Sequence, residues 1–146
     1  MPNSDSSDQL TTIRQLIAIN EQNVTNLESV ASAIEDRGLG QVLEDFALDC
    51  EHFSHDLENW IDDHQPIPAE QADSAGAGFR LSLNGKTTRH EILATTERAE
   101  ETVLDRYRTA IENTTQPDLK RLLIEQFEQL QDIHNWLHRV RLAVAA

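Results

Sequence analysis

Apolar residues recur at helical spacing in four separate stretches of the chain, and this pattern constrains the fold more than any other feature. Within each stretch they lie mostly three and four positions apart, as one buried face of a helix requires. In the last stretch, for example, Leu123, Phe127 and Leu130 follow this rule. The sequence therefore predicts an all-α domain with helices over about 10–35, 39–62, 88–113 and 117–142.

The boundaries between these stretches carry helix-terminating signals. Gly38 stands where a left-handed C-cap would end the first helix. Thr88 and Glu91 have the spacing of a capping box at the start of the third helix, and Pro117 suits the first position of the fourth. The short connections on either side of the chain's middle make helices one and two, and helices three and four, antiparallel neighbours.

The middle of the chain, residues 63–87, has no sustained period and contains two prolines and three glycines, namely Pro66, Pro68, Gly76, Gly78 and Gly85. It reads as a crossover long enough to span a bundle. Two antiparallel helical hairpins joined by one long crossover form the topology of ferritin-like four-helix bundles, whereas simple up-down bundles use short loops throughout. Residues 1–9 are expected to form a disordered N-terminal tail, and residues 143–146 a short C-terminal tail.

The composition limits the possible partners. The 146 residues include 12 Lys and Arg against 26 Asp and Glu, which gives a formal net charge of −14. Such a charge repels phosphate backbones and anionic lipid, so we expect neither nucleic acid nor membrane as a partner. One cysteine offers no disulfide framework, and the polar opening lacks the features of a signal peptide, so we expect a cytoplasmic protein. The glycosylation pattern Asn23-Val24-Thr25 means little without secretion.

Polar residues inside the apolar stripes are the candidates for function. Projection at about 100° per residue puts Asn20 at the centre of the first stripe, Glu100 near the middle of the third beside Tyr107, and His134 within the fourth. Counting outward from the turn between the last two helices brings His134 close to Glu100. Because a buried carboxylate needs a partner, we expect Asn20, Glu100, His134 and Tyr107 to form a buried polar network that fixes helix register.

The alternative interpretation is a di-metal carboxylate site, or a remnant of one. Such a site needs a Glu from each of two helices and a Glu-x-x-His from each of the other two. The chain offers only Asp49-x-x-His52 and Gln131-x-x-His134, and His52 and Gln131 project away from their apolar faces. Under this alternative Glu97, Glu100 and His134 would bind iron or zinc; under the first interpretation the protein has no cofactor.

The chain from about Leu10 to Arg141 resembles a bacterial ferritin-like family of four-helix-bundle proteins catalogued only as a domain of unknown function. The matching pieces are Leu16-Ile17 with Ile19-Asn20, Phe53 with Asp56-Leu57, His90 and Ile92-Leu93 leading into Glu97-Arg98-Ala99-Glu100-Glu101 with Tyr107, and His134. Where that family usually has a Glu and an aromatic residue in the first helix, this chain has Thr25 and Leu27. The resemblance implies a ferritin-like fold and very little about activity.

The sequence thus predicts a single ferritin-like bundle that acts as a non-catalytic cytoplasmic module, binding or structural, with a buried polar network in place of a full di-metal site. Its partner would be an unidentified protein or a second copy of the chain. The alternative function is a metal-binding, ferritin-related oxidoreductase or iron-handling protein that uses a degenerate carboxylate and histidine site.

Overall fold

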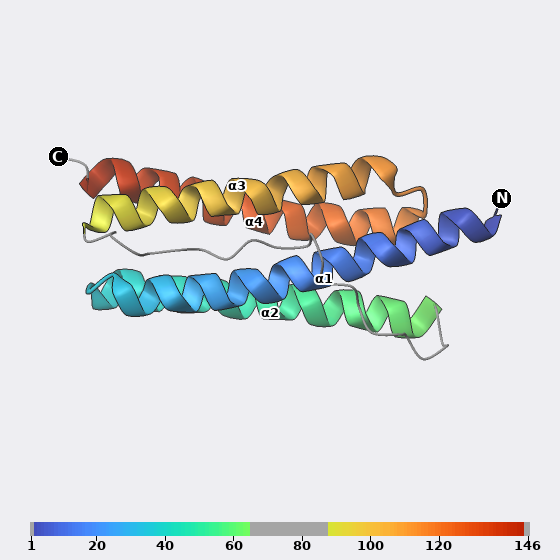
Figure 1. The fold of residues 1–146 in the computed structure, drawn as a ribbon, viewed down its shortest axis with the longest axis horizontal. Coiled ribbons are helices and arrows are strands. Elements are labelled where there is room, and N and C mark those ends of the chain that lie inside the picture. Colours follow the sequence, from blue (N-terminus) through green and yellow to red (C-terminus); the bar gives the residue numbers. More distant parts are fainter. Residues whose placement is uncertain (1, 65–87, 145–146) are drawn as a thin grey trace.

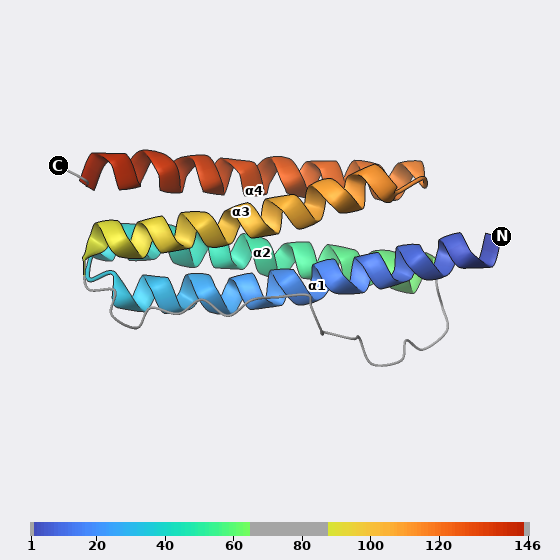
Figure 2. The same ribbon diagram turned by 45° about the horizontal axis from the view of Figure 1, so that its top comes forward.

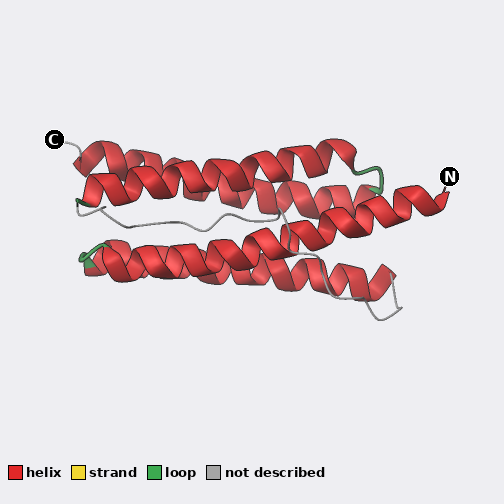
Figure 3. Cartoon of the chain, in the orientation of Figure 1, coloured by secondary structure: helices red, strands yellow, loops and turns green. Residues whose placement is uncertain are grey.

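The computed structural model describes the backbone of residues 2–64 and 88–144 and, within these ranges, the side chains from residue 8 onward. These residues form four helices and no strand (Figure 3). The helices are α1 (Pro2–Ala33), α2 (Arg37–His64), α3 (Arg89–Asn113) and α4 (Pro117–Val144).

The four helices lie side by side along a common long axis. Figure 1 shows α2 returning alongside α1, and α4 returning alongside α3. Rotation of the view shows that α1 also lies next to α3 and that α2 lies next to α4 (Figure 2). The turn between α1 and α2 lies at the opposite end of the molecule from the turn between α3 and α4, so α2 ends far from where α3 begins (Figure 1).

The core runs along the centre of all four helices. It consists of apolar side chains from every helix, which at the inner positions are almost completely buried, among them Leu27, Leu57, Leu93 and Leu123. Burial of a side chain of this kind contributes about 1.5–3 kcal/mol to folding. These leucines fall on the four predicted stripes, which explains why periodicity alone locates the helices.

The turn between α1 and α2 differs from the sequence prediction. The residue with a left-handed backbone is Glu35, at φ 51°, whereas Gly38 lies inside the first turn of α2. Asp36 explains the difference, because its Oδ1 accepts a hydrogen bond from the backbone N–H of Leu39 at 3.0 Å and so caps α2 earlier than expected. Gly40 lets α1 and α2 pack closely, since a Cβ there would lie 3.2 Å from the carbonyl oxygen of Ala31, a tight contact.

α3 and α4 begin at the residues that the sequence indicates. The hydroxyl of Thr88 accepts a hydrogen bond from the backbone N–H of Glu91 at 3.1 Å and donates one to the Glu91 side chain at 2.8 Å. Pro117 is the first residue of α4, where its missing N–H costs nothing. The side chain of Gln116 accepts from the backbone N–H of Leu119 at 2.8 Å and completes this cap.

The ends of the helices correct three further expectations. α1 begins at Pro2, so residues 2–9 are helical and not a disordered tail. Pro2 suits a first helical position. α4 extends to Val144, two residues into the expected C-terminal tail. α2 continues to His64, and the remainder of the predicted crossover, 65–87, lies outside the described residues.

None of the helices in the described ranges has the length and apolar character needed to cross a membrane.

Candidate functional site

A chain of side-chain hydrogen bonds crosses the middle of the core and joins all four helices. Asn20 on α1 donates from Nδ2 to the hydroxyl of Tyr107 on α3 at 2.6 Å. That hydroxyl donates to Oε1 of Gln126 on α4 at 2.7 Å. Gln126 then donates from Nε2 to the carbonyl oxygen of Phe53 on α2 at 3.2 Å. These three contacts link the helices in the order α1, α3, α4 and α2.

Helical position explains why these side chains meet. Asn20 lies one turn after Leu16 on the buried face of α1, and its Nδ2 also donates to the Leu16 carbonyl oxygen at 3.0 Å. Gln126 stands between Leu123 and Leu130 on the stripe of α4. Asn20 and Tyr107 have no exposed surface, and Gln126 retains only 2%. Polar groups this deep are costly unless paired, so the hydrogen bonds fix which residues face each other.

A second polar cluster lies further along the same faces of α1 and α3. Asn23 on α1 donates from Nδ2 to Oε2 of Glu100 on α3 and to Sγ of Cys50 on α2, both at 3.3 Å. Glu100 and Cys50 have no exposed surface. Asn23 thus lies between a carboxyl group and a thiol that are both inaccessible to solvent.

Burial shifts the pKa of all three titratable groups in these clusters in the same direction. It raises the pKa of Glu100 to about 7, which the hydrogen bond from Asn23 only partly opposes. It raises the pKa of the Cys50 thiol well above its usual value, with a further contribution from the nearby Glu100 charge. It likewise raises the pKa of Tyr107 far above its usual value. Each group is therefore favoured in its protonated, neutral form.

Two buried oxygens in this region lack a hydrogen-bond donor. They are Oδ1 of Asn20 and Oε1 of Glu100. Asn20 and Asn23 lie one turn apart on the same face of α1, so one unpaired oxygen belongs to a residue next to Asn23 on that face and the other to the residue that Asn23 binds on α3. Unsatisfied buried groups of this kind are rare and need a physical explanation.

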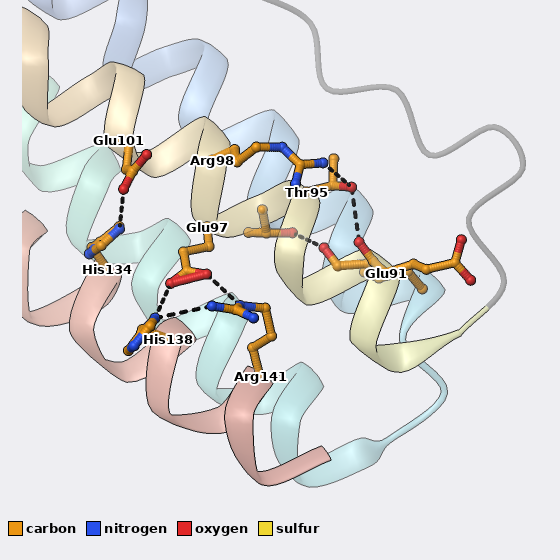
Figure 4. Close-up of polar contacts among 10 residues, drawn as sticks. Glu91, Thr95, Glu97, Arg98, Glu101, His134, His138 and Arg141 are labelled. Atoms are coloured by element: carbon orange, nitrogen blue, oxygen red, sulfur yellow. Dashed lines mark hydrogen bonds and ion pairs between the residues drawn. The ribbon is translucent and has the colours of Figure 1, made fainter. Parts of the chain in front are cut away.

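His134 does not join the network, contrary to the sequence prediction. Its Nε2 lies 3.4 Å from Oε1 of Glu101, the residue after Glu100, and the two side chains face each other from α4 and α3 (Figure 4). The side chain of His134 is 17% exposed. Counting residues from the turn between α3 and α4 placed His134 at about the correct height along the bundle. It did not show which residue of α3 His134 would face, because consecutive residues of a helix point about 100° apart.

Glu97 lies one turn before Glu100 but belongs to a different cluster on the seam between α3 and α4 (Figure 4). Its Oε1 accepts from Nδ1 of His138 at 2.5 Å, and its Oε2 accepts from Nε of Arg141 at 2.6 Å. Partial burial acts to raise the pKa of Glu97, but the hydrogen bonds and charges of Arg141 and His138 together outweigh it, so the pKa is lowered.

These contacts separate the three residues of the alternative metal site. Glu97 is paired with Arg141 and His138, Glu100 with Asn23, and His134 with Glu101. Across residues 8–64 and 88–144, no group of three or more His, Cys, Asp and Glu side chains is arranged to hold a metal ion. The set of Glu97, Glu100 and His134 is therefore not assembled as the alternative required.

Sequence reasoning missed three members of the two clusters: Asn23, Cys50 as a hydrogen-bond acceptor, and Gln126. The signals existed. Asn23 stands three residues after Asn20, and Gln126 stands three after Leu123 and four before Leu130, so both fall on buried faces by the same projection that located Asn20. No sequence signal predicted that Cys50 would meet Asn23, since this contact depends on how α1 and α2 pack.

Comparison with known proteins gives no further guide to identity. No family model matches the chain, and no curated protein matches it in sequence.

Proposed function

We propose that the chain is a ferritin-like antiparallel four-helix bundle that acts as a non-catalytic cytoplasmic module, binding or structural. In this proposal the buried polar network occupies the position that a di-metal site would take in a catalytic relative. The function of the network is to fix the register of the helices and hence the shape of the outer surface.

One observation carries the proposal: the side chains of Asn20, Tyr107 and Gln126 at the centre of the bundle are hydrogen-bonded to one another. A catalytic or metal centre needs polar groups that are free to bind something else. Glu100 and Cys50 have no exposed surface, and the raised pKa of the Cys50 thiol disfavours its reactive thiolate form.

The ferritin-like topology is supported by the placement of the helix ends. α2 ends at one end of the molecule and α3 begins at the other (Figure 1). In bundles with short loops throughout, each helix begins at the end where the preceding one stops.

The partner in this proposal is a protein, either an unidentified one or a second copy of the chain. The net charge of −14 disfavours nucleic acid and anionic membrane. Three large apolar side chains, Leu48, Ile124 and Leu142, are exposed on α2 and α4 and are available to a protein partner. Sedimentation of the purified protein over a range of concentrations distinguishes self-association from a monomer that requires another partner.

The register role is tested by Asn20→Leu, with Asn113→Leu at an exposed position of α3 as the matched control. Loss of Asn20 leaves Tyr107 without its donor but keeps the apolar stripes intact, so helix content should persist while the dispersion of amide signals in a two-dimensional NMR spectrum is reduced. The control should leave the spectrum unchanged. A fully dispersed spectrum for Asn20→Leu, equal to that of the control, would contradict the proposed role.

A further inference from the structure

We propose that Glu100 carries a proton in the folded protein and donates it from Oε1 to Oδ1 of Asn20, so that loss of this proton above neutral pH loosens the seam between α1 and α3. The inference goes beyond the register role, because it makes the strength of the network depend on pH.

The first ground is the absence of any charge that could hold Glu100 as a carboxylate. In the described part of the chain its one hydrogen-bond donor is the neutral amide of Asn23, and it forms no ion pair. A fully buried carboxylate without a cation is among the most costly groups in a protein, and it takes up a proton instead.

The second ground is the pair of unsatisfied oxygens. Asn20 Oδ1 and Glu100 Oε1 are both buried acceptors without a donor. A proton on Oε1 removes both defects at once, because the resulting hydroxyl is itself the donor that Asn20 lacks. Glu100 Oε2 continues to accept from Asn23, so the neutral acid is satisfied at both oxygens. The bond also joins the Asn20–Tyr107–Gln126 chain to the cluster of Asn23 and Cys50.

The titratable groups on the surrounding helices do not compete for this role. α1 contributes only the neutral amides Asn20 and Asn23, and α2 contributes the Cys50 thiol, whose own pKa is raised by burial. On α4, His134 is turned toward Glu101. On α3 itself, Glu97 is held by Arg141 and His138, and the Tyr107 hydroxyl already donates to Gln126.

The raised pKa of Glu100 sets the pH range over which the proton is lost. Burial raises the pKa of Glu100 from 4.5 to about 7, so the folded state binds this proton more tightly than the unfolded state does. The contribution to stability is therefore fully present below about pH 4.5 and is lost as the pH rises through 7. Above that pH the ionised Glu100 no longer donates to Asn20, and the seam between α1 and α3 must admit water or open.

The test compares wild type with Glu100→Gln, because the glutamine amide reproduces the neutral acid: its Oε1 accepts from Asn23 and its Nε2 donates to Asn20. The equilibrium constant for unfolding in urea should rise between pH 5 and pH 8 in wild type by on the order of 50-fold more than in Glu100→Gln. Glu97→Gln, one turn away on the same helix, is the matched control. The free energy of unfolding of Glu97→Gln should fall furthest below that of wild type at pH 8. The difference should shrink as the pH falls through the lowered pKa of Glu97.

A difference between wild type and Glu100→Gln that is the same at pH 5 and pH 8 would overturn the proposal and leave the register role of the network untouched. Should Glu100→Gln fail to fold, hydrogen exchange of the wild type decides the matter without a variant. Protection of α1 amides near Asn20 and Asn23, corrected for intrinsic exchange, should fall between pH 6 and pH 8, while that near Arg141 should not. Equal changes at the two places would contradict the proposal.

Discussion

Glu97 and Glu100 lie one turn apart on α3, both largely removed from solvent, yet their pKa values move in opposite directions. Glu97 retains 8% exposure and is held by Arg141 and His138, so its pKa is lowered. Glu100 has no exposure and a single amide donor, and burial raises its pKa to about 7. Two factors separate these carboxyl groups: Glu100 is buried more deeply, and Glu97 alone has cationic partners.

The same comparison separates two kinds of contact between helices. The α3–α4 seam at Glu97 is held by opposite charges near the surface, and it strengthens as the carboxyl group ionises. The core at Glu100, Asn20 and Tyr107 is held by neutral hydrogen bonds, and it weakens if a charge appears. One helix thus carries two contacts with opposite dependence on pH.

Of the changes considered, Asn23→Leu should have the largest effect on the pH dependence of the contact at Glu100. Among the residues that the structure describes, Asn23 is the one hydrogen-bond donor to Glu100, and the change removes it. We expect the free energy of unfolding at pH 8 to fall by about 3 kcal/mol, and by clearly less at pH 5, where Glu100 is neutral. Urea denaturation at pH 5 and at pH 8 measures the two losses of stability. An equal loss at pH 5 and pH 8 would mean that Asn23 acts by packing alone.

Tyr107→Phe tests the neutral part of the core. It leaves the Asn20 amide and Oε1 of Gln126 without their shared partner while keeping the ring. We expect a loss of about 2 kcal/mol that is the same from pH 5 to pH 8, because burial raises the pKa of Tyr107 far above this range. A loss that varied with pH would show that Tyr107 and Glu100 titrate together.

Arg141→Met tests the charged seam, with a smaller expected effect because the cluster is partly solvated. The free energy of unfolding at pH 7 should fall by about 1.5 kcal/mol. Since the pKa of Glu97 is lowered in the folded state, its contribution is present above about pH 4.5 and lost as the pH falls through the folded value, so the deficit should vanish in acid. Asp105→Asn, which breaks the exposed pair with Arg108, is the control and should cost no more than about 0.5 kcal/mol. A persistent deficit at acid pH would contradict the ion-pair account.

Much of the fold could be predicted from the sequence because burial imposes a period. The stripes that contain Leu16, Leu57, Leu93 and Leu123 locate the helices, and the cap residues Thr88 and Pro117 set two of their starts. The start of α1 could not be found this way, because the sequence of residues 2–9 contains no apolar stripe.

The site was only partly predictable for a related reason. Projection shows which face of a helix a residue occupies, so the burial of Asn20, Glu100 and Tyr107 follows from their positions. It does not fix the rotation of one helix against another, and a rotation of one residue decides whether His134 meets Glu100 or Glu101. The pairing of Glu97 with Arg141 was beyond reach for the same reason.

The account depends on an interior whose hydrogen bonds are made between its own side chains. The most direct test measures the metal content of protein purified without chelator, together with the unfolding midpoint before and after treatment with a chelator. The account predicts no stoichiometric metal and an unchanged midpoint. One redox metal ion per chain that is lost in Glu100→Ala, with a lowered midpoint after chelation, would contradict it.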